Sequence, residues 1–172
     1  MIASMADRVT VNVSDGIADV RFNRPDKRNA LDGEQFVAIA AAGEQLKAMS
    51  GVRVVVLSGE GPSFCAGLDF SVFEVMAGGS MSGGDGDGER QAQGNPGRIT
   101  ESGLTHLGQQ VCWVWQELPV PVIAAVQGHA LGGGLQIALG ADIRIVAPDV
   151  QMSVLEIRWG LIPDMCGTML LP

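Results

Sequence analysis

The sequence has no apolar run long enough to cross a membrane and no recognisable signal peptide. Its longest apolar runs, 52–57 and 120–126, are much shorter than the roughly 20 residues that a spanning helix needs. Asp7 and Arg8 interrupt the N-terminus before the apolar core of a signal peptide is reached. We therefore expect no membrane association and a cytoplasmic location.

Cations are scarce. The 172 residues include 11 Lys and Arg against 19 Asp and Glu, a formal net charge of −8. This charge disfavours nucleic acid as a partner, and no basic run offsets it. A single compact basic cluster, Arg21, Arg24, Lys27 and Arg28, flanks Pro25. The cluster is interpreted either as a seat for a polyanionic group such as phosphate or as an ordinary solvated turn.

Cysteine is also rare, and its spacing carries no metal or disulfide pattern. Cys65, Cys112 and Cys166 lie far apart, without a C-x-x-C pair or a matching histidine spacing. This excludes both a disulfide framework and a zinc site, so we expect no metal and three small buried side chains.

What the chain does have is apolar content, 47% of its residues, in a length that suits one domain over 1–172. Apolar periodicity and turn residues predict alternating strands and helices. In the first part of the chain we expect a hairpin over 8–22, a helix over 32–50 capped by Asp32 and a strand over 52–57 buried on both faces. A helix over 99–118, a strand over 122–126 and a helix from about Gly132 are expected next. The last expected elements are a buried strand over 142–146, a strand over 152–157 and a short helix from Asp164.

Residues 77–97 are mostly Gly, Ser, Asp and Gln without periodicity. Such a composition buries too little surface to offset the entropy of ordering it, and we expect a mobile loop. Composition leaves open whether this loop covers a site or is only a tolerated insertion.

Two glycine-punctuated segments, 64–69 and 128–136, each follow a β-rich run. Their small residues let a ligand approach the main chain, so that both segments can aim N–H groups at one oxygen. This pattern is typical of an oxyanion hole, and together the segments indicate acyl-thioester chemistry.

Four motifs in one order, 23–31, 64–69, 128–136 and 155–167, carry a family resemblance. The chain resembles the crotonase superfamily, the enoyl-CoA hydratase/isomerase family. The resemblance implies an α/β fold, the crotonase-like (ClpP/crotonase) spiral of β-β-α units, in a homotrimer or a hexamer. It also implies an acyl-CoA substrate and no cofactor, since coenzyme A is part of the substrate. By this resemblance, we expect the family's C-terminal helical part to be absent from this chain.

The resemblance assigns the oxyanion donors to the main-chain N–H groups of Leu68 and Gly133. A helix start at Gly133 suits this role, because unpaired N–H groups and the helix dipole favour a developing negative charge. The substrate-binding residues that the resemblance implies are Lys27, Arg28, Ala30, Ala66, Gly67, Asp69, Gly132 and Trp159.

The resemblance also places the catalytic glutamate at Glu156, whose alternative role is a strand-end carboxylate paired with Arg158. Hydratases of the family use a second glutamate where this chain has Gln136, which can hold a water but cannot take its proton. Double-bond isomerisation is therefore favoured over hydration. Asp164 is either a further acid, as in dienoyl-CoA isomerases, or only the N-cap of the last helix.

Two functions of different classes remain at this point. One is an enzyme that acts on unsaturated fatty acyl-CoA through an enolate, and the other is a truncated scaffold or pseudoenzyme with little or no turnover. A serine protease of the related spiral fold has little support, because no serine lies in a nucleophile elbow.

Overall fold

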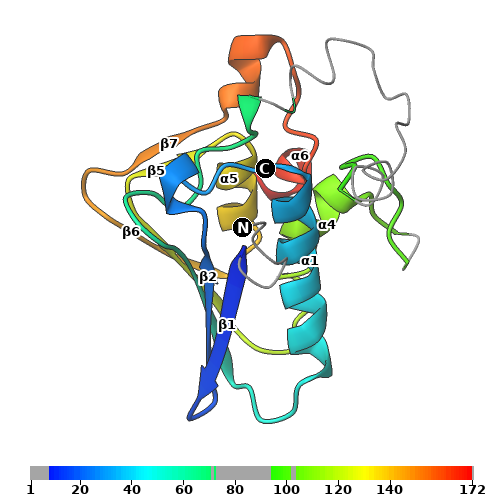
Figure 1. Cartoon of the computed structure of the whole chain (residues 1–172), viewed down its shortest axis with the longest axis vertical. Helices are drawn as coiled ribbons and strands as arrows, with labels where there is room; N and C mark the ends of the chain where they lie inside the picture. Colours follow the sequence, from blue (N-terminus) through cyan, green and yellow to red (C-terminus); the bar gives the residue numbers. More distant parts are fainter. Residues whose placement is uncertain (1–7, 71, 73–93, 102–103, 172) are drawn as a thin grey trace.

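A five-stranded sheet with helices packed along one side organises the residues that the computed structural model describes, which are 8–70, 72, 94–101 and 104–171 (Figure 1). The first pair of strands is antiparallel and the others pair in parallel. In spatial order the strands are β1 (Val9–Ser14), β2 (Ile17–Phe22), β3 (Val54–Gly59), β4 (Val122–Val126) and β6 (Ile143–Val146). This alternation of strands and helices confirms the predicted α/β class.

A second, two-stranded parallel sheet joins β5 (His129–Leu131) to β7 (Gln151–Ser153). The described helices include four α-helices and two 3₁₀ helices. These are α1 (Gly33–Ala48), α4 (Leu107–Trp113), α5 (Gly133–Leu139), α6 (Gly167–Leu170), η2 (Pro25–Lys27) and η3 (Leu155–Trp159).

The predicted hairpin is confirmed. Strands β1 and β2 pair from Val9 with Phe22 to Ser14 with Ile17. Between them, Asp15 and Gly16 both have positive φ, 52° and 81°. Two consecutive positive φ values are typical of the type I′ turn, whose twist matches that of the flanking strands.

Helix α1 begins where the sequence predicted and ends slightly early. The side chain of Asp32 accepts a hydrogen bond from the N–H of Gln35 at 2.9 Å, as an N-cap does. Phe36, Ile39 and Leu46 are buried on the inner side of α1. Met49 is the C-cap of this helix and is 37% exposed.

The sheet is buried on one face only, which corrects the expectation for β3. Val55 and Leu57 are fully buried, whereas Val54 and Val56 are half-buried. The reason is that the described helices α1, α4 and α5 lie on the same side of the sheet (Figure 1). The parallel strand pattern alone does not distinguish one covered face from two.

Strand β6 corrects a second expectation. It was predicted to be buried, but Ile143 is 50% exposed and Ile145 is 62% exposed. It pairs only with β4 and forms the edge of the sheet, and no described helix covers it.

The helix predicted over 99–118 is much shorter, because a turn occupies its first part. Thr100 donates its N–H to Thr105 O at 2.9 Å, and Ile99 pairs with His106 in an isolated antiparallel bridge. Among the described residues of this range, the helical ones are those of α4, Leu107–Trp113. Trp115, which follows α4, is buried in the core.

The predicted loop over 77–97 falls outside the described residues except for 94–97. A single domain over 1–172 stays a prediction.

Gly43 allows α1 to approach α4, since a Cβ atom at this position would lie 2.3 Å from Cγ2 of Val114. Gly43→Ala is expected to lower the free energy of unfolding by about 1–3 kcal/mol through overpacking, measured by urea denaturation. The double variant Gly43→Ala, Val114→Ala removes the clash and should lose less stability than the sum of the two single variants. Additive losses would contradict this account of the helix contact.

Candidate active site

The two glycine-punctuated segments run side by side, joined by main-chain hydrogen bonds. Cys65 donates its N–H to His129 O at 2.9 Å and accepts from the N–H of Leu131 at 3.1 Å. The approach is so close that a Cβ atom at Gly134 would lie 2.2 Å from Cys65 O. Glycine is therefore required at this position, as its placement in the motif predicted.

The first segment is held on its other side by Leu31. The N–H of Leu31 donates to Gly67 O at 2.8 Å, and the N–H of Asp69 donates to Leu31 O at 2.9 Å. Gly67 has a φ of +92°, and a Cβ atom there would lie 2.6 Å from Leu131 O and 3.9 Å from Gly133 N. These contacts place the peptide of Leu68 close to the start of α5.

The main-chain N–H groups of Leu68 and Gly133 donate to no acceptor in the described part of the chain. Among the described residues, neither donates to a carbonyl oxygen, whereas the neighbouring Gly132 N–H donates to Ser153 O at 2.9 Å. Gly133 is the first residue of α5, and the first N–H groups of a helix have no partner within it. Two unpaired donors therefore lie on adjoining segments.

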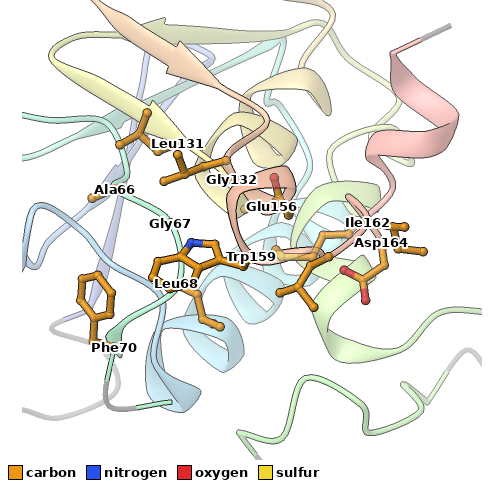
Figure 2. A pocket seen from close by; sticks show the side chains of 14 residues that line it. Ala66, Gly67, Leu68, Phe70, Leu131, Gly132, Glu156, Trp159, Ile162 and Asp164 are labelled. Atoms are coloured by element: carbon orange, nitrogen blue, oxygen red, sulfur yellow. The ribbon is translucent and has the colours of Figure 1, made fainter. Parts of the chain in front are cut away.

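A pocket of about 230 Å³ opens at this point (Figure 2). Eight of the predicted site residues line it together. They are Ala66, Gly67, Leu68, Gly132, Gly133, Glu156, Trp159 and Asp164. In Figure 2 the carboxylate of Glu156 lies next to Gly132, and Asp164 lies across the pocket from Ala66 and Phe70.

Glu156 is held on η3 and not at the end of a strand as predicted, because the pairing of β7 with β5 stops at Ser153. Its Oε2 is buried and has no hydrogen-bond partner among the described residues. Arg158, on the same 3₁₀ helix, is exposed and forms no ion pair within the described part of the chain. A buried carboxylate oxygen without a partner, in a pocket wall, is suited to proton transfer with a bound ligand.

Gln136 lies behind Glu156 and does not belong to the pocket lining. Its Nε2 donates to Glu156 Oε1 at 2.6 Å, and its Oε1 accepts from the N–H of Gly167 at 2.8 Å. The side chain is buried, with 1% of its surface exposed.

Asp164 is not the N-cap of the last helix, so that interpretation is wrong. Helix α6 begins at Gly167 after Cys166, and Asp164 is exposed in the preceding turn. A second cavity, of about 450 Å³, shares Leu68, Leu161, Asp164 and Met165 with the pocket. Asp164 therefore stands where the two cavities meet.

Asp69 is bonded to the basic cluster and does not line the pocket. Its Oδ2 lies 2.6 Å from Arg24 Nη1, and Arg24 also pairs with Asp32 at 3.2 Å. Both Arg24 and Asp69 are largely buried. The ion pair ties the peptide that follows Leu68 to the turn over 23–31.

Lys27, Arg28 and Ala30 belong to the turn over 23–31 and do not line the pocket. Lys27 and Arg28 are exposed, and neither forms an ion pair in the described part of the chain. Arg28 O accepts from the N–H of Ala66 at 3.0 Å, which places the turn next to the first glycine segment. Arg21, by contrast, is paired with Asp19 and Glu60.

Sequence reasoning missed several residues that build the site. Phe70 lines the pocket and packs edge-to-face on Trp159, with ring centroids 6.4 Å apart. Asn29 is buried and donates through Nδ2 to Ser63 O at 2.8 Å and Glu60 O at 3.0 Å. Asn29 has a φ of 56°, a conformation that Asn tolerates, so the signal missed in the 23–31 motif was the residue type at this position. The remaining lining residues that were not predicted are Leu131, Leu155, Leu161, Ile162 and Met165.

Neither histidine lines the pocket that contains Glu156, although His106 lines the second cavity. His129 Nδ1 is 2.8 Å from Ser63 Oγ, and His106 Nδ1 is 2.8 Å from Gly97 O. Within residues 8–70, 72, 94–101 and 104–171, no three His, Cys, Asp or Glu side chains are grouped to bind a metal ion.

Comparison with known proteins identifies the family. Residues 12–172 match the family model described as enoyl-CoA hydratase/isomerase. The chain is 36% identical to the bovine enoyl-CoA hydratase domain-containing protein 2, mitochondrial, over 91% of this chain and 47% of that protein. It is 31% identical to the 1,2-epoxyphenylacetyl-CoA isomerase of Escherichia coli, over 98% of this chain and 58% of the isomerase.

Among solved structures, a Thermobifida fusca protein in complex with acetoacetyl-CoA is similar, with a TM-score of 0.74 and 31% identity. The match covers 96% of this chain and 61% of that one. The chain thus belongs to the enoyl-CoA hydratase/isomerase family and has the crotonase fold. It spans about half the length of the curated relatives that it matches.

None of the helices in the described ranges combines the length and the apolar character that a membrane crossing requires.

The three thiols are expected to be unreactive in the folded protein. Burial raises the pKa of the Cys65 thiol to about 12 and raises the pKa of Cys112 well above its usual value, whereas an unfolded thiol titrates near 8.5. At pH 8.5, Ellman's reagent should therefore label Cys65 and Cys112 only after denaturation. Since the Cys65 thiol ionises between about pH 8.5 and 12 only in the unfolded chain, stability should fall as pH rises through this range. Rapid labelling of Cys65 or Cys112 in the native state would contradict the assignment.

Proposed function

We propose that the chain is the catalytic core of an enzyme that moves a double bond in an unsaturated fatty acyl-CoA thioester. The observation that carries this proposal is the meeting of three groups in one pocket. They are the uncommitted N–H groups of Leu68 and Gly133 and the unpartnered Oε2 of Glu156.

In the proposed reaction, the thioester oxygen accepts hydrogen bonds from Leu68 and Gly133. These donors are fixed by the fold, so they stabilise the enolate oxygen without reorganising when charge develops. One such donor is typically worth about 10²–10³ in rate. The α carbon of the substrate then faces Glu156.

Glu156 Oε2 removes a proton from the α carbon of a 3-enoyl thioester. The electron pair of the broken C–H bond passes into a dienolate, whose charge rests on the thioester oxygen. The new O–H bond of Glu156 then breaks as the proton returns to the γ carbon, which leaves a 2-enoyl thioester and an ionised Glu156. A single carboxyl group thus serves as base and then as acid.

Hydration requires a second group that takes a proton from water, and the position of the family's second glutamate is occupied by Gln136. An amide has no such proton affinity. Isomerisation is therefore proposed as the faster reaction and hydration as a weak one. The names of relatives include both hydratases and isomerases, so the family alone does not decide between them.

The surroundings suit an acyl-CoA. Lys27 and Arg28 are proposed to meet the phosphates of coenzyme A, since both are exposed cations beside the first glycine segment. Trp159 and Phe70 form an apolar pocket wall for the acyl chain, which would pass Leu68 and Met165 into the second cavity. Asp164 stands on this path and is proposed as an additional acid near the γ carbon.

The trimer or hexamer of the family is proposed for this chain as well. The exposed apolar side chains of β6 offer a surface suited to a subunit contact.

Glu156→Gln keeps the size of the side chain but cannot exchange a proton. Turnover of a 3-enoyl-CoA to the 2-enoyl product, followed by the absorbance of the conjugated thioester, should fall by about 10²–10⁴-fold. Asp149→Asn, which removes one negative charge from an exposed turn, is the matched control and should retain wild-type turnover. Unchanged turnover in Glu156→Gln would remove this residue from the mechanism, and binding of the thioester without any wild-type turnover would favour the scaffold alternative.

A further inference from the structure

Gln136 connects Glu156 to the start of α6 through both ends of its side-chain amide. The Nε2 to Glu156 Oε1 distance is 2.6 Å, and the Gly167 N to Gln136 Oε1 distance is 2.8 Å. The three residues come from α5, η3 and α6, and Gln136 is almost completely buried.

The direction of both hydrogen bonds follows from the chemistry of the groups. The N–H of Gly167 can only donate, so it must face the oxygen of Gln136, and the amide nitrogen must then face Glu156. That nitrogen has no lone pair to offer, so Glu156 Oε1 must accept and cannot carry a proton toward it. Because the carbonyl oxygen of a protonated carboxyl group is its stronger acceptor, this contact favours a proton on Oε2 over one on Oε1.

Position 167 has no space for a side chain. A Cβ atom there would lie 2.8 Å from Gln136 Oε1 and 2.7 Å from Cβ of Pro163. The backbone of α6 therefore approaches the amide as closely as a glycine permits, which fixes the position of the glutamine.

Oε2 of Glu156 is buried and has no hydrogen-bond partner among the described residues, in a carboxylate that lines the pocket. The two oxygens are thus unequal: one is held by Gln136, and the other is left for a ligand. We propose that Gln136 is a positioning residue that makes Oε2 the oxygen that takes and returns the substrate proton. The effect of this role on kinetics rests on the proposed function.

Gln136→Met keeps the approximate volume of the side chain and removes both hydrogen bonds. The carboxyl group can then rotate, and kcat for double-bond isomerisation should fall about 10- to 100-fold, with KM for the thioester within about threefold of wild type. A residue with only a structural role would not separate kcat from KM in this way.

Gln136→Glu retains an acceptor for Gly167 but places a second carboxylate against Glu156 Oε1. Two carboxylates in contact share one proton, so the acid limb of the pH–rate profile should move to higher pH by about one unit or more. Other titratable groups near Glu156 among the described residues include Asp164 in the pocket wall and the thiol of Cys112, and these are the same in both proteins. The matched control is Gln45→Glu, the same exchange at an exposed glutamine of α1 away from the pocket, which should leave the profile unchanged.

A measurement on the wild-type chain tests the contact without turnover or a change at position 136. In ¹⁵N-glutamine-labelled protein, the Gln136 side-chain amide proton bonded to Glu156 should resonate downfield and exchange slowly. Glu156→Ala should abolish this signal and leave that of Gln110, which donates to Glu44 and Glu117, in place. Absence of the signal, or wild-type kcat in Gln136→Met, would overturn the positioning role while the proposed function stands. A downfield signal in a protein that turns over no 3-enoyl thioester would instead overturn the proposed function, and with it the kinetic role of Gln136.

Discussion

The site depends on how closely the main chain of 62–68 approaches that of 128–134. A Cβ atom at Gly128 would lie 2.0 Å from Pro62 O, and one at Gly134 would lie 2.2 Å from Cys65 O. Any side chain at these positions would force the segments apart. The same contact brings the N–H groups of Leu68 and Gly133 to one pocket, so the spacing of two backbones determines whether a single oxygen can meet both donors.

The carboxylate that completes the pocket is placed by different means. Glu156 follows β7 on a short 3₁₀ helix, and its orientation comes from Gln136 on α5, which is itself oriented by Gly167 on α6. The side-chain amide of Gln136 behind the pocket is thus bonded at both ends, whereas Glu156 Oε2 in the pocket wall has no hydrogen-bond partner among the described residues. The ion pair between Arg24 and Asp69 holds the end of the first glycine segment, 64–69, against the turn over 23–31.

The sequence predicted those features that depend on neighbouring residues or on family motifs. The Asp15-Gly16 turn and the Asp32 cap follow from local chemistry, and the motif positions of Leu68, Gly133 and Glu156 do meet at one pocket. The errors arise where an element's length or burial depends on which segments pair with each other. The edge position of β6, the turn that shortens α4 and the 3₁₀ helix at Glu156 depend on pairing partners that periodicity does not reveal. The identity of Gln136 predicted the loss of a second base, but its two hydrogen bonds span 20 and 31 residues and were not foreseen.

The most direct measurement is a crystal structure of the chain with acetoacetyl-CoA, the ligand found in the Thermobifida fusca relative. The account predicts that the thioester oxygen lies within about 3 Å of both Leu68 N and Gly133 N, with Glu156 Oε2 as the carboxylate oxygen nearest the α carbon. A thioester oxygen that contacts neither amide, or an α carbon that faces away from Glu156, would contradict it.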